Sequence, residues 1–281
     1  MDKMARQQHP QPLALKEFDQ FADLLKANEL EVVIIQDSSS PHTPDSIFPN
    51  NWIVTDASGS VYLFPMEAEN RRFERRTDIL KEIETRFEVR NIIDLSFLEQ
   101  EGRFLEGTGS MVLDRDNHIA YACLSPRTNP EALQYFCKLS GYKAVTFNAV
   151  DLNNTAIYHT NVLMCLGNSF AVICLEAIQD AGERESVINS LQAANKEIIG
   201  ISYSQLLHFA GNMLQLKNKN KEDLLILSEQ AYKSLSTDQL NRLQRYCRLV
   251  FSPLDTIENT GGGSARCMIA EIFLPDKQAK A

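Results

Sequence analysis

A cysteine near the C-terminus follows three consecutive glycines, in a segment where Gly261–Gly263 precede Cys267. Glycine allows positive φ and a close approach of the backbone to a ligand. A cysteine is nucleophilic as its thiolate, which needs a polar or positive neighbourhood and a nearby base. Arg266 and a histidine from elsewhere would supply both, so Cys267 is the candidate nucleophile. The alternative is a glycine-rich turn with a structural cysteine, because free cysteine is among the most buried residue types.

The remaining cysteines show no Cys-x-x-Cys pairing and lie mostly in apolar surroundings, as packing residues do: Cys123, Cys137, Cys165, Cys174 and Cys247. The sequence therefore signals neither a zinc site nor a disulfide framework. It also contains no motif for an organic cofactor. We expect chemistry that uses side chains alone, with no metal and no cofactor.

Three further residues complement a thiol: His159, Glu106 and Asp45. A histidine beside a cysteine can activate the thiol and later deprotonate a water molecule. Two carboxylates suit a planar cationic substrate, because a guanidinium offers N–H donors in a fixed fork. Each residue also has a structural interpretation: Asp45 could cap a turn, Glu106 could be an exposed loop acid, and His159 could be a hydrogen-bonded core histidine.

Arginines provide candidate anion-binding groups. Arg127, in the segment from Ser125 to Asn129, could hold a substrate carboxylate or be a solvated loop residue. Arg71 and Arg72 have the same two interpretations, and the case for binding a substrate carboxylate is weaker for them than for Arg127.

A repeat of strand, turn, strand and helix positions these residues. Its first strands begin at small or polar residues, which we call the repeat openings: Asn51, Ser110, Asn161, Asn212 and Cys267, separated by 59, 51, 51 and 55 residues. A near-constant period of this kind is typical of a repeat architecture. Closure of five modules into a ring would bring the openings to one end, where loops on a rigid scaffold build a site. An open stacked array is the alternative, although solenoids usually have shorter periods.

Apolar periodicity predicts the individual elements. The strand-turn-strand segments are expected at 52–65, 111–124, 162–175 and 213–227, and the helices at 71–90, 130–140, 183–195 and 237–246. Before the first module we expect a loose polar lead-in, a helix, a short buried strand and a loop rich in Ser and Pro, at 1–12, 13–27, 31–35 and 36–49.

Length and charge limit the class of protein. The 281 residues carry a formal charge of -9, which argues against a nucleic-acid partner because phosphate binding depends on Lys and Arg. No apolar run reaches the roughly 18 residues of a membrane helix, and Pro10 and Pro12 interrupt the N-terminus where a signal peptide would be apolar. We expect a single catalytic domain over 1–281 in the cytoplasm, with no nucleic-acid or membrane partner. The oligomeric state stays open, a homodimer included.

The motifs resemble the guanidino-group modifying superfamily, which includes arginine deiminase, dimethylarginine dimethylaminohydrolase and the amidinotransferases. The resemblance rests on Pro44–Phe48 with Asn50–Asn51, on Leu105–Gly109, on His159, and on Gly261–Cys267. It spans roughly residues 31–275. The versions Phe-Pro-Asn-Asn-Trp and Leu-Glu-Gly-Thr-Gly-Ser are similar to those of the bacterial citrulline-utilisation hydrolase branch. The resemblance implies an α/β propeller of five blades, called the pentein fold.

The resemblance also implies roles for individual residues. Cys267 would be the nucleophile, His159 the acid and base, and Glu106 the carboxylate that binds substrate nitrogens and orients the histidine. Asp45 would be the second acid on the guanidino or ureido end. Arg127 would hold the α-carboxylate, with Arg71 as a weaker candidate.

Two departures from the family pattern bear on the substrate. Asn50 and Asn51 stand where the dimethylarginine hydrolases carry Glu-Asp, and Gly107–Ser110 stands where many members have Gly-Gly-Asp after the glutamate. Fewer acids mean less negative charge facing the substrate, which favours a neutral ureido group over a guanidinium. Asn51 is thus a candidate substrate-binding residue.

The sequence therefore predicts a cysteine-dependent hydrolase of a C–N bond in a guanidino or ureido amino acid, citrulline or an arginine derivative. The alternatives are an amidinotransferase and a non-catalytic propeller that binds another molecule.

Overall fold

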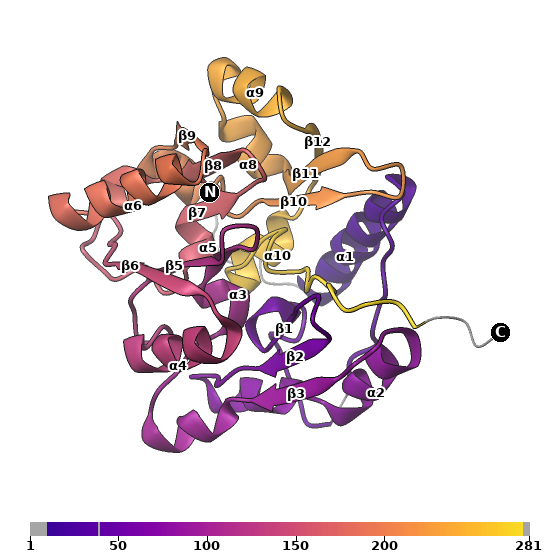
Figure 1. Cartoon of the computed structure of the whole chain (residues 1–281). Helices are drawn as coiled ribbons and strands as arrows, with labels where there is room; N and C mark the ends of the chain where they lie inside the picture. Colours follow the sequence, from indigo (N-terminus) through magenta and orange to yellow (C-terminus); the bar gives the residue numbers. More distant parts are fainter. Residues whose placement is uncertain (1–9, 39, 278–281) are drawn as a thin grey trace.

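The computed structural model describes residues 10–38 and 40–277 and has an α/β fold built on four small sheets of three strands each. Figure 1 shows the sheets around a central region that contains the short helices α3 (Gly107–Ser110) and α5 (Thr160–Leu163), with α10 (Asp255–Gly261) near them. The four sheets correspond to the first four predicted modules.

The sheets share one topology. In each, the first strand is antiparallel to the second, and the second is parallel to the third. The strands are β1 (Ile53–Thr55), β2 (Ser60–Leu63) and β3 (Asn91–Asp94); β4 (Val112–Asp114), β5 (Ile119–Cys123) and β6 (Lys143–Phe147); β7 (Met164–Leu166), β8 (Phe170–Ile173) and β9 (Glu197–Gly200); and β10 (Leu214–Lys217), β11 (Asp223–Ser228) and β12 (Arg248–Ser252). The sequence predicted the first two strands of each sheet and missed the third.

A helical segment connects the second strand of each sheet to the third, as a parallel pair requires. The connecting helices are α2 (Thr77–Arg86), α4 (Pro130–Ser140), α6 (Ala181–Ala193), and α8 (Glu229–Ser234) with α9 (Thr237–Gln244). The predicted bounds of α4 are confirmed. They could be predicted because both ends have capping residues: Asn129 Oδ1 accepts from the N–H of Glu131 and Ala132, and Gly141 ends the helix in the left-handed conformation.

The buried core follows the sheets. The largest apolar cluster joins the third and fourth sheets and includes the fully buried Phe170 and Leu225, and a second cluster joins the first two sheets around Phe64 and Phe136. No helix within residues 10–38 and 40–277 is long and apolar enough to span a bilayer.

The other predicted helices have different bounds in the structure. Helix α6 begins and ends two residues before the predicted 183–195, and α9 ends two residues before the predicted 246. The predicted helix over 71–90 is a 3₁₀ helix, η3 (Glu69–Glu74), followed by α2. The break places the Arg71 side chain in the protein interior instead of on a solvated face. At the N-terminus, α1 (Pro10–Ala27) begins three residues before the predicted start, so residues 10–12 belong to the helix. Residues 1–9 of the predicted lead-in lie outside the described residues.

The predicted strand over Glu31–Ile35 is wrong. This segment has no strand partner among the residues that the structure describes, and Ile34 and Ile35 are 36% and 37% exposed. The apolar segment after Cys267, residues 269–273, likewise belongs to no strand. A fifth sheet is therefore absent from the part of the chain that the structure describes, because neither segment has a neighbour with which to form a ladder.

The first three repeat openings lie together. They occur in the short helical turns η2 (Pro49–Asn51), α3 and α5, and α3 contacts both of the others. Asn212 and Cys267 join this group through the hydrogen bonds described below.

Candidate active site

Cys267 is buried among polar groups that face its sulfur. Its Sγ accepts hydrogen bonds from Asn161 Nδ2 at 3.3 Å and from Asn212 Nδ2 at 3.2 Å, and the residue is 5% exposed. Donors aimed at a sulfur stabilise its anionic form. The three residues occupy equivalent openings of the predicted repeat, and the structure brings the candidate nucleophile and its two donors together.

The glycine-rich loop before Cys267 is fixed by close packing. Helix α10 ends at Gly261 and is followed by Gly262, which has φ of 70° in the left-handed region. A Cβ atom on Gly263 would lie 2.7 Å from Phe48 Cε1, so this loop depends on glycine to pack against that ring. Ser264 Oγ donates to Glu258 Oε1 at 2.5 Å and ties the loop to α10. This packing holds Cys267 in place.

His159 and Glu106 form a buried pair, with His159 Nε2 2.7 Å from Glu106 Oε2. The other carboxylate oxygen, Oε1, accepts from the backbone N–H of Glu67 at 3.0 Å. Burial acts to raise the pKa of Glu106, but the hydrogen bond and charge of His159, with Arg127 and Arg71, lower it to about 2. Glu106 is therefore a carboxylate that fixes the imidazole and stabilises its protonated form.

Burial lowers the pKa of His159 below its ordinary value, although Glu106 acts in the opposite direction. The imidazole is consequently neutral near pH 7 and ready to accept a proton. Its ring lies 4.9 Å from the ring of Tyr158, whose hydroxyl donates to the carbonyl oxygen of Gly262 at 2.8 Å. Tyr158 thus connects the histidine to the cysteine loop.

Arg71 is a second buried charge beside this pair. It donates from Nη1 to Asn51 Oδ1 at 2.8 Å, and from Nε and Nη2 to the carboxylate of Glu74 at 2.8 and 3.0 Å. Its Nη1 lies 3.9 Å from Glu106 Oε2 and its Nε 4.0 Å from Asp45 Oδ2. Burial acts to lower the pKa of Arg71, but Glu74, Glu106 and Asp45 raise it, so the guanidinium keeps its charge.

Gly109 leaves room for two of these side chains. A Cβ atom there would lie 2.3 Å from Asn51 Nδ2 and 2.9 Å from Cε1 and Nδ1 of His159. The NH₂ end of Asn51 and the imidazole therefore face the same small space above α3.

Asp45 and Arg127 lie at the accessible edge of the site. Their side chains are 38% and 33% exposed, whereas Glu106 is fully buried. Arg127 Nη1 lies 3.6 Å from Glu106 Oε2, and its guanidinium lies 5.3 Å from the centre of the Tyr158 ring. The Asp45 carboxylate and the Arg127 guanidinium are therefore the groups of the site that a ligand can contact from solvent.

The structure thus brings six of the predicted residues into one network of close contacts: Asp45, Asn51, Arg71, Glu106, Arg127 and His159. Cys267 is joined to it indirectly, because Tyr158 packs against His159 and bonds to Gly262 of the cysteine loop. The sequence placed Asn212 among the polar residues at the openings without a chemical role, and it assigned no site role to Asn161, Glu74, Glu67 or Tyr158. A signal for the two asparagines was present, because they occupy the same repeat position as Asn51 and Cys267. No such signal marked the others.

Three buried amide atoms at or next to the repeat openings have no hydrogen-bond partner within the described residues: Asn50 Oδ1, Asn51 Nδ2 and Asn161 Oδ1. Buried polar groups are normally paired, so unpaired ones beside a reactive centre indicate a place for ligand atoms. Within residues 10–38 and 40–277, no group of three or more His, Cys, Asp or Glu side chains could hold a metal ion.

Comparisons with known proteins agree with this fold. The chain is a member of the guanidino-group modifying superfamily, which has the pentein fold. A family model described as eukaryotic N,N dimethylarginine dimethylhydrolase matches residues 2–274, so the chain belongs to this family. No curated protein sequence matches it.

Solved structures share the fold at low sequence identity. One is the N-terminal domain of ArgZ bound to product, an arginine dihydrolase from the ornithine-ammonia cycle in cyanobacteria (TM-score 0.74, 19% identity, 94% of this chain and 89% of that one). A single-residue variant of that domain, covalently bound to a reaction intermediate, matches equally well. A dimethylarginine dimethylaminohydrolase adduct with 4-chloro-2-hydroxymethylpyridine has a TM-score of 0.64 (15% identity, 92% of this chain and 90% of that one).

Proposed function

We propose that the protein is a cysteine-dependent hydrolase of a C–N bond in a guanidino or ureido amino acid. One combination of contacts carries the proposal: a cysteine sulfur accepts from two amide donors, and one of these amides, Asn161, follows by two residues a histidine that is paired with a carboxylate. This combination supplies a nucleophile, a proton carrier and a group that stabilises the protonated carrier.

In the first half of the reaction, Cys267 Sγ attacks the central carbon of the planar group. The thiol proton passes to His159, which Glu106 stabilises as an imidazolium. Asp45 holds the planar group by its N–H donors, and Arg127 holds the α-carboxylate; the donors of Arg71 are already taken by protein acceptors. The C–N bond then breaks, and His159 returns the proton to the departing nitrogen.

In the second half, His159 removes a proton from water as the oxygen attacks the thio-linked carbon. The bond to Sγ breaks, and the thiolate recovers a proton from His159. With citrulline, ornithine leaves first and the carbamoyl group is released as carbamic acid, which decomposes to ammonia and carbon dioxide. With a guanidino substrate, ammonia or an alkylamine leaves and the product is citrulline.

We infer that the substrate is the neutral ureido amino acid citrulline. Arg71 can only donate hydrogen bonds, so it orients Asn51 with Oδ1 toward itself and the NH₂ group toward Gly109 and His159. A ureido oxygen accepts from such a donor, whereas a guanidinium has no acceptor. The positive charge of Arg71, close to Asp45 and Glu106, also reduces the attraction for a cation.

We further infer that residues 1–281 form one catalytic domain with five repeats around an axis, and that the protein works in the cytoplasm. Four sheets of common topology and the likeness to pentein structures support the five-fold arrangement.

A substrate panel tests the proposal. Purified protein would be given citrulline, arginine, monomethyl- and dimethylarginine and agmatine, with ammonia followed continuously and the amino-acid product identified by mass spectrometry. Conversion of citrulline to ornithine is the expected result. Formation of citrulline from the arginines would support a hydrolase but contradict the inference of a ureido substrate. No turnover of any of these compounds would contradict the hydrolase itself. Added glycine would reveal amidino transfer.

A further inference from the structure

Tyr158 lies directly before His159 and contacts two other parts of the site that the proposed reaction needs. Its hydroxyl donates to the carbonyl oxygen of Gly262 at 2.8 Å, in the cysteine loop, residues 261–267. The centre of its ring lies 4.9 Å from the centre of the His159 ring and 5.3 Å from the guanidinium carbon of Arg127. The proposed reaction assigns no role to these contacts, although they join the nucleophile's loop, the proton carrier and the anion-binding group.

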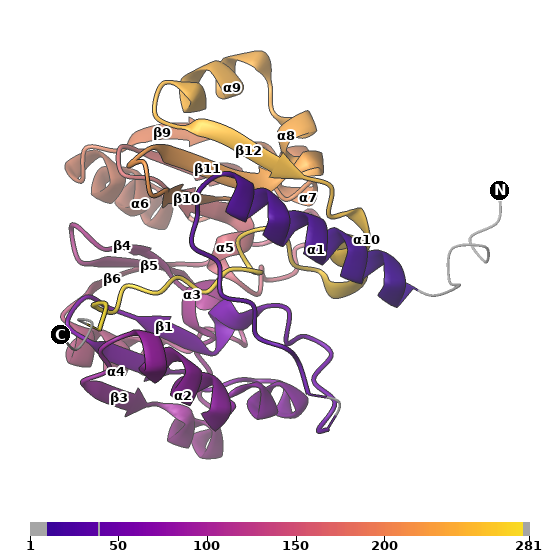
Figure 2. The same cartoon turned by 90° about the vertical axis from the view of Figure 1, so that its right-hand side faces the viewer.

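The cysteine loop follows a helix that is itself anchored. Helix α1 lies along α10 (Figure 2). The carboxylate of Glu17 in α1 accepts from the backbone N–H groups of Thr256 and Ile257, in the first turn of α10, at 2.9 to 3.0 Å. The glycines that follow, at 261–263, have no side chains with which to hold the backbone. The bond from Tyr158 therefore holds the chain at the middle one of these three glycines.

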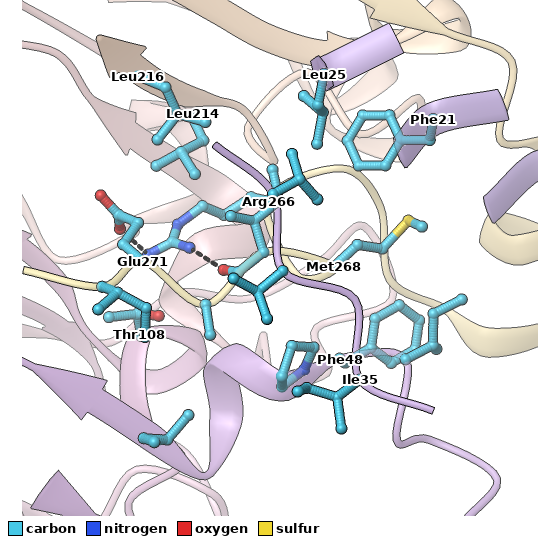
Figure 3. A pocket seen from close by; sticks show the side chains of 18 of the residues that line it. Phe21, Leu25, Ile35, Phe48, Thr108, Leu214, Leu216, Arg266, Met268 and Glu271 are labelled. Carbon is cyan, nitrogen blue, oxygen red and sulfur yellow. Dashed lines mark hydrogen bonds and ion pairs between the residues drawn. The ribbon is translucent and has the colours of Figure 1, made fainter. Parts of the chain in front are cut away.

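A cavity of about 1380 Å³ borders the same loop. Its wall includes Gly261, Arg266 and Met268, and Figure 3 shows Arg266 and Met268 there together with Phe48. Close packing on all sides is what normally fixes a buried segment. Because the cavity leaves the loop less closely packed on this side, the position of the loop depends more strongly on polar contacts such as the bond from Tyr158.

Arg127 depends on Tyr158 in a different way. Its Nη1 lies 3.6 Å from Glu106 Oε2 and its Nε 4.0 Å from Glu67 Oε2, and both distances are longer than a hydrogen bond. The Tyr158 ring lies at cation–π distance. The hydroxyl of Ser125 joins the two backbones, because it donates to Tyr158 O at 2.7 Å and accepts from Arg127 N at 3.1 Å. The ring thus supports a guanidinium whose N–H donors make no close contact with these carboxylates.

The Tyr158 hydroxyl remains a donor across the pH range in which a cysteine reacts. Burial and the charge of Cys267 raise the pKa of Tyr158 to about 12, although Arg127 acts in the opposite direction. A protonated phenol can donate to a carbonyl oxygen, whereas a phenolate cannot. A negative charge on Cys267 therefore favours the form of Tyr158 that holds the loop.

We propose that Tyr158 is a positioning residue with two separable parts. Its hydroxyl holds the cysteine loop so that the Cys267 sulfur stays beside its two amide donors. Its ring holds Arg127 in position for the α-carboxylate of the substrate. The inference rests on the proposed function, because it takes Cys267 as the nucleophile and Arg127 as the carboxylate-binding group.

Hydrogen exchange measures how firmly the loop is held, without any substrate. The backbone N–H groups of Gly262, Arg266 and Cys267 are hydrogen-bonded to protein acceptors. Tyr158→Phe removes the hydroxyl and keeps the ring, so exchange in the peptide that contains these residues should become about threefold to tenfold faster. Tyr135→Phe, at an exposed tyrosine of α4, is the matched control and should exchange as the wild type does.

Kinetics on the substrate of the panel, expected to be citrulline, separates the two parts of the side chain. Tyr158→Phe should lower kcat about threefold to tenfold, because the sulfur is held less precisely, and leave KM within about twofold, because the ring is kept. Tyr158→Leu also removes the ring and should raise KM about threefold or more, because Arg127 loses its cation–π contact. A side chain with only a structural role would lower stability in both variants without this division between kcat and KM.

Three results would overturn the proposal. They are unchanged exchange of the loop in Tyr158→Phe, a KM in Tyr158→Phe as high as in Tyr158→Leu, and a wild-type KM in Tyr158→Leu. Absence of turnover by the wild-type protein would instead overturn the proposed function and the role of the ring with it. The exchange experiment would still decide the role of the hydroxyl, so the two failures are distinguishable.

Discussion

Arg71 Nη1 donates to Asn51 Oδ1 at 2.8 Å, and this bond determines which end of the Asn51 amide faces the site. A guanidinium has no acceptor, so the amide NH₂ must point away from it, toward Gly109 and His159. A carboxylate at the same position would present only acceptors. In the proposed reaction, the Arg71–Asn51 pair would therefore favour a ureido oxygen over a guanidinium nitrogen.

Replacing Asn51 with aspartate should change the substrate preference. We expect kcat/KM for citrulline to fall and the ratio of arginine to citrulline turnover to rise at least about tenfold, because a donor is lost and a negative charge is gained. The measurement is the substrate panel applied to Asn51→Asp, with Asn153→Asp, a similar charge change at an exposed loop residue, as the control. An unchanged ratio would contradict the assigned role.

Cys267→Ser should remove activity and preserve the fold. The hydroxyl keeps an acceptor for the Asn161 and Asn212 amides, so the circular dichroism spectrum should be unchanged. Turnover should fall about 10⁴-fold or more, as it does when nucleophiles are replaced in other hydrolases. Cys137→Ala, a half-buried cysteine outside the site, is the control and should retain activity. Substantial turnover by folded Cys267→Ser would exclude a covalent cysteine mechanism.

The elements that sequence periodicity predicted are those with local signals. The first two strands of each sheet are apolar runs joined by turns, and α4 has an asparagine cap and a terminal glycine. The third strands carry no such pattern. Asn91–Asp94 is mostly exposed, and its residues show little alternation of polar and apolar types. It forms a strand because it pairs with β2, which lies about 30 residues earlier in the chain, and no local pattern reveals such a pairing.

Pairing also explains the wrong strand prediction. Residues 31–35 are as apolar as a buried strand, but a strand needs a neighbour at hydrogen-bonding distance, and none of the described residues pairs with this segment. For the site, the resemblance predicted Glu106, His159 and Cys267, whose contacts link three distant segments. It did not reveal that Arg71 is buried against Glu74, because a single sequence does not distinguish a buried arginine from a solvated one.

The pH profile should depend on His159. The imidazole must be neutral to accept the thiol proton, and burial lowers its pKa below the ordinary 6.5. Activity should therefore persist below pH 6.5 and fall only in more acidic solution. Glu106 acts to raise the pKa of His159, so Glu106→Gln should move the acid limb to still lower pH while decreasing kcat.

This profile would be measured as kcat/KM from about pH 4 to about pH 9, the range in which histidine and cysteine titrate. His42→Gln changes an exposed histidine and should leave the curve unchanged. An acid limb above pH 6.5, or one that stays in place in Glu106→Gln, would be inconsistent with a neutral His159 paired to Glu106.

Asn161→Leu should make Cys267 less reactive. The change keeps the approximate side-chain size and removes one of the two donors to Sγ, so the thiolate loses one stabilising hydrogen bond. A hydrogen bond to a charged group contributes about 1.5–3 kcal/mol, so alkylation by iodoacetamide at fixed pH should slow about tenfold or more. Asn220→Leu, in an exposed turn, serves as the control. Equal alkylation rates in all three proteins would show that the amide does not stabilise the thiolate.

Gly109→Ala tests the packing of the centre. The new methyl group would lie 2.3 Å from Asn51 Nδ2 and 2.9 Å from the His159 ring, so one or both side chains must move. We expect a loss of about 1–3 kcal/mol in the free energy of unfolding, as for overpacked cores, and a loss of activity of about 10²-fold or more. Gly200→Ala meets no atom within 4 Å and should change neither quantity.

The double variant Gly109→Ala/Asn51→Ala separates the two contacts. Removing the Asn51 amide relieves the shorter contact, so part of the lost stability should return in urea unfolding. The contact with His159 persists, so kcat should stay low. Full recovery of activity in the double variant would mean that the imidazole does not need the space above Gly109, and that the position assigned to His159 in the reaction is incorrect.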